Sequence, residues 1–200
     1  MNSRLGAPRP RGRRPGPTAT KEAILGAARS SFLATGYEET SLRSIAAAAD
    51  VDVALLGYYF GSKRDLFAAA MALPVNPPDA LGALFEDGVP SGRDVVARLL
   101  EVWDDPVSGP PLAALLKSAT RDEQGRELVS GFIEAEIVGT VARSLPGPEA
   151  RRRARAIATI ILGFLSARYV LKLGFASGRP GRALADDFGA LLDPWLKRVY

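Results

Sequence analysis

The side chains that most often carry catalytic or metal chemistry are missing from this sequence. Its 200 residues contain no histidine and no cysteine, which removes the usual general base and the commonest zinc ligands. Two acidic pairs, Asp104-Asp105 and Glu134/Glu136, are the remaining candidates for acid–base or metal chemistry. Because no nucleophile motif accompanies them, we interpret them as solvated helix ends and faces. We therefore expect no catalytic centre, no cofactor and no metal site.

Positive charge is concentrated in the first third of the chain, whose formal net charge at pH 7 equals the total of +4. Residues 1–65 hold ten basic and six acidic side chains, whereas residues 66–200 hold sixteen of each. Arg11, Arg13 and Arg14 belong to an N-terminal arm rich in Pro, Gly and Arg. This uneven distribution is the one that attraction to nucleic-acid phosphates would require.

Residues 40–67 contain the pattern that would position such contacts, two short helices joined by a tight turn. Leu42, Ile45, Ala46 and Ala49 recur at the i, i+3, i+4, i+7 spacing of one apolar helix face. A helix from about Thr20 to Thr35 precedes them, with Thr20 as its cap and with Ile24, Leu25, Ala28, Phe32 and Leu33 pointing inward. A helix-turn-helix of this kind can place its second helix in the major groove of DNA.

The residues at the helix ends support this interpretation. Ser41 and Asp52 can cap the two helices, because their side-chain oxygens can accept the amides of a first turn. Gly61 suits a left-handed stop. Ser62 and Asp65 then form a capping-box variant that opens the next helix, with Asp in place of Glu.

These segments resemble the N-terminal motif of the TetR family of transcriptional regulators. The resemblance runs from about Thr18 to Leu73 and becomes weak after residue 75. It consists of Gly36-Tyr37, Thr40-Ser41, Ile45-Ala46-Ala47-Ala48-Ala49, Tyr59-Phe60-Gly61-Ser62-Lys63 and Leu66-Phe67, in that order.

Two positions depart from the family pattern. The turn usually contains Gly where this chain has Asp50, and Asp tolerates a positive φ, so we expect the turn to form. The family usually has an aromatic residue or His where this chain has Gly57. A glycine there costs roughly 1 kcal/mol of helix stability relative to Ala, and it either removes one DNA contact or lets the backbone approach the groove.

The resemblance implies an all-α fold: an N-terminal three-helix helix-turn-helix DNA-binding domain plus a C-terminal helical ligand-binding and dimerisation domain. We place a flexible basic arm at residues 1–17, the DNA-binding domain at 18–75 and the regulatory and dimerisation domain at 76–200. The implied function is that of a homodimeric repressor that binds a palindromic operator in double-stranded DNA and is released by a small-molecule effector.

The resemblance also assigns DNA contacts. Ser41, Arg43, Tyr58, Tyr59 and Lys63 match family positions that hold phosphates or touch base edges. Since consecutive helical residues point about 100° apart, Tyr58 and Tyr59 cannot both point inward beside Phe60. The outward face of the second helix would consist of Val53, Ala54, Leu55 and Gly57, and the arm would add Arg11, Arg13 and Arg14. The residues on the outward face of the second helix are small or apolar, so they would read thymine methyl groups and DNA shape.

The C-terminal sequence predicts amphipathic helices near residues 79–85, 93–103, 112–121, 127–144, 149–174 and 182–200. The last two of them carry more apolar residues than one neighbouring helix could cover, which favours a four-helix dimer interface. The residues concerned are Ile157, Ile160, Ile161, Phe164, Leu165, Val170, Leu184, Phe188, Leu191, Leu192 and Trp195.

An effector cavity is the least specific of these expectations. Phe85, Trp103, Phe132 and Phe164 are candidates to line it, and ordinary core packing explains them equally well. Arg168, beside Tyr169, could meet an acidic group on the ligand, or it could face solvent. The cavity would suit a mostly apolar molecule.

Two other functions are compatible with the same residues. A nonspecific nucleoid-type DNA binder would rely on the basic arm, and a ligand carrier or helical enzyme could retain a vestigial helix-turn-helix. The longest apolar stretch, Ala156 to Ala167, is too short to span a bilayer, and the N-terminus lacks the apolar core of a signal peptide. We therefore expect a cytoplasmic protein with no membrane partner.

Overall fold

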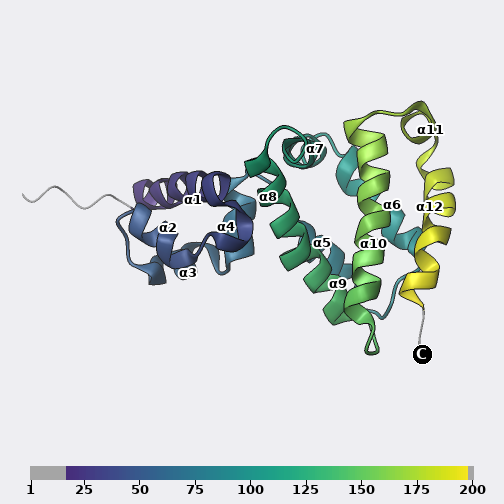
Figure 1. Cartoon of the computed structure of the whole chain (residues 1–200), viewed down its shortest axis with the longest axis horizontal. Helices are drawn as coiled ribbons and strands as arrows, with labels where there is room; N and C mark the ends of the chain where they lie inside the picture. The colour runs from purple at the N-terminus through teal and green to yellow at the C-terminus, as the bar shows by residue number, and fades with distance from the viewer. Residues whose placement is uncertain (1–16, 198–200) are drawn as a thin grey trace, which may run out of the picture.

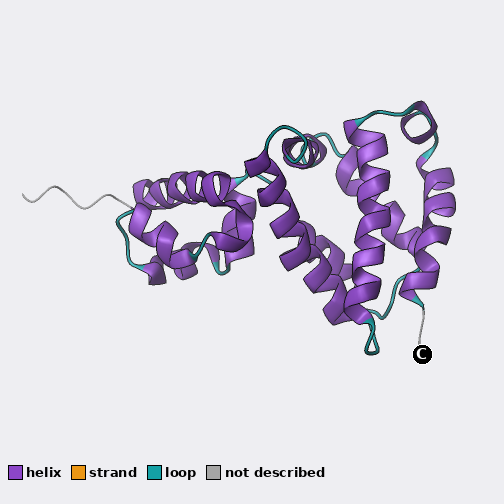
Figure 2. Cartoon of the chain, in the orientation of Figure 1, coloured by secondary structure: helices purple, strands orange, loops and turns teal. Residues whose placement is uncertain are grey.

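A computed structural model of the chain describes residues 17–197, and over that range every regular element is helical (Figures 1 and 2). The all-α prediction is confirmed. The elements in chain order are α1 (Pro17–Glu39), α2 (Leu42–Ala48), α3 (Val53–Phe60), α4 (Lys63–Ala70), α5 (Pro77–Gly82), η1 (Ala83–Phe85), α6 (Gly92–Asp104), α7 (Gly109–Ser118), α8 (Glu123–Phe132), η2 (Ile133–Val138), α9 (Gly139–Ser144), α10 (Ala150–Leu165), η3 (Ser166–Val170), α11 (Gly174–Ser177) and α12 (Gly181–Leu196).

Helices α1 to α4 form one group around an apolar cluster, seen at the left of Figure 1. The regular helix of α1 is interrupted at Gly36, whose φ of 78° is left-handed. It begins at Pro17, so Thr20 is not its cap as the sequence suggested; proline is well tolerated in a first turn, where its missing amide is not needed. Leu33, predicted to point inward, is 43% exposed because it lies beside the buried stripe of Ile24, Ala28 and Phe32.

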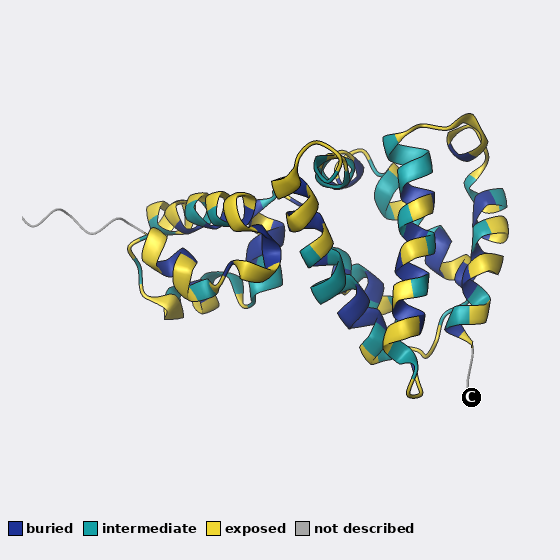
Figure 3. Ribbon diagram, viewed as in Figure 1, coloured by how far each residue is buried: buried dark blue, intermediate teal, exposed yellow. Residues whose placement is uncertain are grey.

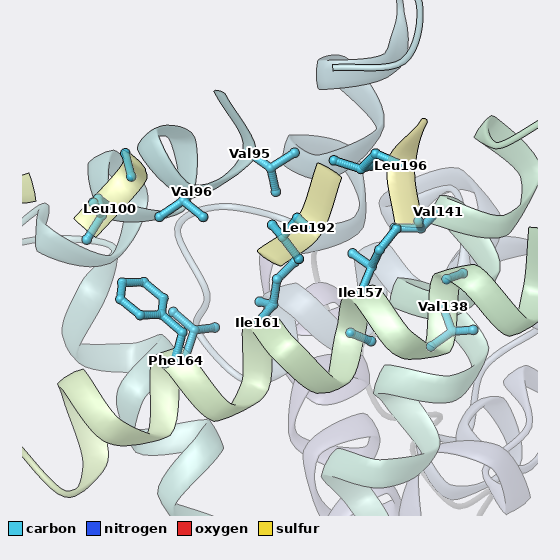
Figure 4. Close-up of a cluster of buried hydrophobic side chains, with 14 of the residues drawn as sticks. Val95, Val96, Leu100, Val138, Val141, Ile157, Ile161, Phe164, Leu192 and Leu196 are labelled. Carbon is cyan, nitrogen blue, oxygen red and sulfur yellow. The ribbon is translucent and has the colours of Figure 1, made fainter. Parts of the chain in front are cut away.

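Helices α6, α10 and α12 enclose the larger core. Figure 4 shows the α10 side chains Ile157, Ile161 and Phe164 directed towards residues of α6 and α12. Most of the apolar surplus expected for a dimer interface is therefore buried within the subunit. Ile157, Ile161, Phe164, Leu165, Leu184 and Leu192 are all 9% exposed or less.

Two of the C-terminal helices begin before the apolar pattern does. α7 starts at Gly109 and not near residue 112, because Pro110 and Pro111 can occupy a first turn. α8 starts at Glu123 and not near residue 127, because Asp122 caps it by accepting the Gly125 amide at 2.7 Å. Both starts depend on residues that a search for apolar periodicity does not weigh.

Segments of π-helix follow two of the regular helices. η2 continues α8 into α9, and η3 continues α10. A π-helical turn is rare and is found most often at functional sites. Here the first of them, η2, joins the part of the chain that packs against α1 to the part that packs against α10.

Helices α6 and α12 pack so closely that there is no room for a side chain between them. A Cβ atom on Gly92 would lie 2.1 Å from the carbonyl oxygen of Gly189, and one on Gly189 would lie 2.5 Å from the amide nitrogen of Arg93. The Gly92 amide donates to an Asp193 carboxylate oxygen at 2.9 Å, which lowers the pKa of Asp193. Asp193 thus contributes to the capping of α6 from a different helix.

Arg153 ties the C-terminal end of α12 to the start of α10. Its side chain is 3% exposed, and its guanidinium donates to the carbonyl oxygens of Trp195, at 2.7 Å, Pro146, at 2.8 Å, and Leu196. A cation at a helix C-terminus also interacts favourably with the helix dipole. The buried charge is therefore compensated by backbone carbonyls.

Substituting Gly92→Ala should destabilise the protein. The new methyl group would overlap the α12 backbone, and overpacking of this kind typically costs about 1–3 kcal/mol. The measurement is urea unfolding of the full chain at fixed protein concentration. Gly26→Ala is the matched control, since nothing lies within 4 Å of its added Cβ, and it should stabilise α1 by up to about 1 kcal/mol. Equal stability of the two variants would contradict the packing described.

Candidate DNA-binding helices and ligand cavity

The turn between α2 and α3 has the geometry that the sequence predicted. Asp50 has a φ of 54°, so it adopts the left-handed conformation usually supplied by glycine. The Val51 amide then donates to the Ala46 carbonyl oxygen at 3.0 Å, and Asp52 caps α3 by accepting the Ala54 amide at 2.8 Å. α3 is thereby held at a fixed angle to α2.

α2 is capped at its exposed end. Ser41 and Ser44 form a reciprocal capping box: the Ser44 amide donates to the Ser41 hydroxyl at 3.0 Å, and the Ser41 amide donates to the Ser44 hydroxyl at 3.1 Å. Ser41 and Arg43 are both exposed at this end. The sequence identified Ser41 as the cap but missed its partner, because Ser44 is not the Glu or Gln usual at that position.

The outward face of α3 is narrower than predicted. Val53 is 41% exposed, Tyr58 is 81% exposed, and Ala54 and Gly57 are exposed as well. Leu55 is half-buried against the N-terminal core. Figure 3 shows α2 and α3 carrying mainly exposed and intermediate residues, so this surface is free to approach another molecule.

The two tyrosines of α3 point in different directions, as the helical geometry requires. Tyr58 is the most exposed large apolar residue of those described, whereas Tyr59 is half-buried and packs against the core. Their rings contact each other edge to face, with 5.2 Å between centroids. The hydroxyl of Tyr58 is therefore presented outward by a ring that its neighbour supports.

Lys63 lies at the joint between α1 and α4. Its ammonium group donates to the Glu38 carbonyl oxygen at 3.2 Å and sits 4.6 Å from the centroid of the Tyr37 ring. Partial burial lowers the pKa of Lys63. An ammonium has three N–H donors, so others remain for a second acceptor. Arg11, Arg13 and Arg14 lie outside the described residues.

Tyr37 joins the group of helices α1 to α4 to α8 and η2. It is 1% exposed, and its ring contacts those of Phe32, Phe67 and Phe132 at centroid distances of 5.7, 5.1 and 5.3 Å. Its hydroxyl donates to a Glu136 carboxylate oxygen at 2.7 Å. Burial, together with this carboxylate, raises the pKa of Tyr37 well above its usual range. We call the four rings the aromatic joint.

A cavity of about 120 Å³ lies on the other side of Phe132. It is lined by side chains from α5 to η2 and from α9 and α10, nearly all of them apolar. The lining includes Arg98, Val102, Trp103, Phe132, Ile133 and Ile137. An apolar cavity of this kind, with few polar groups, is typical of a small-molecule site.

The five predicted ligand residues divide between this cavity and its surroundings. Trp103 and Phe132 line it, whereas Phe85, Phe164 and Arg168 do not. Phe164 packs against Phe188 in the core, with the two rings tilted and 4.6 Å between their centroids. Arg168 donates to the Ala176 carbonyl oxygen at 2.7 Å and pairs with Asp104 at 2.9 Å. Phe85 packs at the edge of the larger core.

The acidic pairs singled out in the sequence have structural partners. Their carboxylates accept or pair with neighbouring groups on the same or adjacent helices: Asp104 with Arg168 (2.9 Å), Asp105 with the Ser108 amide (2.7 Å), Glu134 with Arg151 (2.7 Å) and Glu136 with the Tyr37 hydroxyl (2.7 Å). Capping hydrogen bonds lower the pKa of Asp105, and hydrogen bonds from Arg155 and Arg151 lower that of Glu134.

Within residues 17–197, no three acidic side chains gather where they could hold a metal ion. No helix in the same range combines the length and apolarity needed to cross a membrane.

Both halves of the chain match known protein families. Residues 24–70 match the family described as bacterial regulatory proteins, tetR family, and residues 90–196 match the family described as tetracyclin repressor-like, C-terminal domain. No curated protein matches the chain significantly.

Solved structures with similar chains include a TetR-family regulator from Streptomyces coelicolor. It is 33% identical, with 94% of this chain and 99% of that chain covered and a TM-score of 0.52. A putative TetR-family transcriptional regulator from Mesorhizobium loti is 16% identical over 90% of this chain and 96% of its own, with a TM-score of 0.44. A TetR transcriptional regulator from Rhodococcus sp. RHA1 is 18% identical over 92% and 100%, also with a TM-score of 0.44.

The raised pKa of Tyr37 predicts a loss of stability in alkali. The unfolded phenol has a pKa of about 10, and in the folded protein this pKa is higher. The free energy of unfolding is therefore unaffected by this group below about pH 10 and falls as the pH rises further. Tyr37→Phe removes this titration, and Tyr169, whose pKa is raised in the same direction, keeps its own in both proteins.

We expect Tyr37→Phe to lower the free energy of unfolding by about 1 kcal/mol at neutral pH, since Glu136 loses its donor. Between about pH 8 and about pH 10.5, the variant should then lose less stability than the parent. Urea unfolding at both values measures the difference. The lowered pKa of Lys63 acts in the opposite direction in both proteins, so the comparison isolates Tyr37. Parallel losses would contradict the assignment.

Proposed function

The chain belongs to the TetR family of ligand-responsive, DNA-binding transcriptional regulators, and we propose that it is a repressor that a small molecule releases from its operator. The observation that carries this proposal is the exposed face of α3, held at a fixed angle to α2 by Asp50 and Asp52. A helix presented in this way fits the major groove. We place its site of action in the cytoplasm and divide the chain into a DNA-binding part, 18–75, and a regulatory part, 76–200.

The proposed DNA contacts fall into two classes. Ser41, Arg43, Tyr58, Tyr59 and Lys63, together with Arg11, Arg13 and Arg14 of the arm, would hold phosphates or base edges. Val53, Ala54 and Gly57 would face the bases, with Leu55 at the margin. Since this face has few hydrogen-bonding groups, sequence recognition would depend on thymine methyl groups and DNA shape. The exposure of α3 and of the start of α2 supports these assignments.

A homodimer that reads a palindromic operator is the second part of the proposal. TetR-family regulators are dimeric, and two recognition helices roughly 34 Å apart would meet successive major grooves. The candidate surface lies along α10 and α12. Phe188, Leu191 and Trp195 recur at i, i+3 and i+7 on α12, and Ile160 lies on α10. Leu191 is 54% exposed and the other three are half-buried, so a partner would cover them.

The effector site of the proposal is the apolar cavity beside Phe132. A mostly apolar molecule would suit its lining. Of the predicted ligand residues, Trp103 and Phe132 remain candidates for direct contact. Phe85, Phe164 and Arg168 would instead support the surrounding core. A ligand bound there would release DNA only through its differential affinity for the two conformations of the subunit pair.

Arg43→Gln and Tyr58→Phe should both weaken operator binding. Loss of a phosphate contact should reduce the slope of log affinity against log salt by about 0.9 per contact, and loss of a neutral hydrogen bond should weaken binding by several fold. The measurement is fluorescence anisotropy on an operator selected from genomic fragments, over a range of salt. Arg182→Gln, at an exposed position near the start of α12, is the control and should bind like the parent.

Scrambled competitor DNA decides between the proposal and nonspecific binding. A specific operator should be bound at least about 10³ times more tightly than the scrambled DNA. Equal affinity for both would favour a nucleoid-type binder. Failure to bind any fragment would favour a ligand carrier. Unchanged affinity of both variants would refute the assignment of these two contacts alone.

Leu191→Arg should shift the protein from dimer to monomer at micromolar concentration, because a charge would be buried in the proposed interface without a partner. Sedimentation analysis measures the change, and operator affinity should fall with it. Val107→Arg is the matched control, since Val107 is 65% exposed in the loop between α6 and α7. A parent that is monomeric, or a Leu191→Arg variant that remains dimeric, would reject this surface.

A further inference from the structure

The cavity beside Phe132 has an unusual hydrogen-bonding character. Among its lining side chains only Arg98 and Trp103 carry polar atoms. Both are donors: a guanidinium has five N–H groups and no acceptor, and an indole has one N–H. No lining side chain can accept a hydrogen bond, so a ligand hydroxyl or amine would find no side-chain acceptor there, whereas an oxygen with lone pairs would find donors.

Arg98 also carries the only formal charge among the lining residues. Arg98 lines the cavity and its side chain is also 47% exposed, so the residue lies at the edge of the cavity. Its aliphatic stem can cover apolar surface while the charged end stays hydrated. Two acidic groups on helices that line the cavity are engaged with other cations: Asp104 of α6 pairs with Arg168 at 2.9 Å, and Asp79 of α5 pairs with Arg64 at 2.8 Å.

The present partner of Arg98 is weakly held. Its guanidinium lies 3.1 Å from a Glu101 carboxylate oxygen, one turn along α6, and the Glu101 side chain is 66% exposed. Ion pairs between exposed side chains contribute little to stability. A carboxylate arriving from the cavity could therefore replace Glu101 at small cost, and pairing a guanidinium with a carboxylate allows two parallel hydrogen bonds.

The size of the cavity limits the rest of the molecule. Its volume of about 120 Å³ is somewhat below that of an apolar cavity of roughly 150 Å³ known to accept benzene. One aromatic ring or a short alkyl chain would fill it, with the charged end directed towards α6.

We infer that the effector is a small organic carboxylate, with an apolar body inside the cavity and its carboxylate paired with Arg98. This inference rests on the proposed function, because it assumes that the cavity is the effector site. It adds the chemical class of the ligand and the residue that selects it.

The experiment compares acids with their uncharged counterparts. Hexanoate, octanoate and phenylacetate are titrated into the full-length protein by calorimetry, alongside hexanol, octanol and phenylethanol. The carboxylates should bind about tenfold more tightly or better, the effect of one hydrogen-bonded charge. Arg98→Met keeps an unbranched stem but removes the charge; it should abolish the advantage of the acids and leave the alcohols unchanged.

Arg93→Met is the matched control, because Arg93 lies on the same helix but pairs with Asp186 of α12, away from this cavity. It should retain the full preference for acids. Equal affinity of acids and alcohols in the parent, an undiminished preference in Arg98→Met, or binding of neither class would overturn the inference.

Operator release in the same titrations separates this inference from the proposed function. Release by the alcohols as effectively as by the acids would support a ligand-released repressor and overturn the carboxylate assignment. Binding of acids through Arg98 without loss of operator affinity would support the ligand class and refute the switch.

Discussion

The burial of Tyr37 is the interaction on which the arrangement of the two parts of the chain depends. A phenol hydroxyl removed from water costs several kcal/mol unless it finds a partner, and here the partner is Glu136, on the regulatory side. The helical backbone is broken at Gly36, directly before Tyr37, and Gly131 of α8 lies close to the Tyr37–Glu38 segment. A Cβ on Gly131 would lie 3.3 Å from the Glu38 side chain. The orientation of α1, and with it that of α2 and α3, is thus fixed by α8 and η2.

Phe132 gives the aromatic joint a second role, because its ring contacts other rings of the joint and also lines the cavity. Its ring stacks on Phe67 at 4.5 Å and meets Tyr37 at 5.3 Å, and it also lines the cavity. The π-helical turn η2 follows at once and carries both Glu136, which holds Tyr37, and Ile133 and Ile137, which line the cavity. A ligand that moves Phe132 therefore alters the surroundings of Tyr37 without any intermediate element. Such a molecule can shift the equilibrium only by the difference in its affinity for the two arrangements.

The features that could be predicted from the sequence are those set by residues close together in the chain. The caps at Ser41 and Asp52, the left-handed turn at Asp50 and the stop at Gly61 are set by residues a few positions apart, and the structure contains each of them. The cavity is built where several helices meet, so aromatic residue type alone placed only two of the four aromatic candidates on it. A usable signal for Arg98 did exist: it lies three residues after Val95 and four before Val102, on the apolar side of α6. The close approach of α6 and α12 has no local signal, because Gly92 and Gly189 are ninety-seven positions apart in the sequence.

The α6–α12 contact is packed more tightly than the α1–α8 contact, and this difference indicates which pair of helices can move. Between α6 and α12 an added Cβ would meet backbone at 2.1 Å, so neither helix can slide past the other without a collision, and Arg153 fixes the end of α12. Between α1 and α8 the corresponding distances are longer: 3.5 Å at Gly36, an ordinary contact, and 3.3 Å at Gly131, a tight contact whose nearest atom is the Cγ of the Glu38 side chain. The cavity lies between α6, α8 and α10. Of these helices, α6 is held by a tight contact with α12, whereas α8 has a looser contact with α1. If the proposed effector binds in the cavity, a displacement of α8 would reach α1, because these two helices are packed against each other.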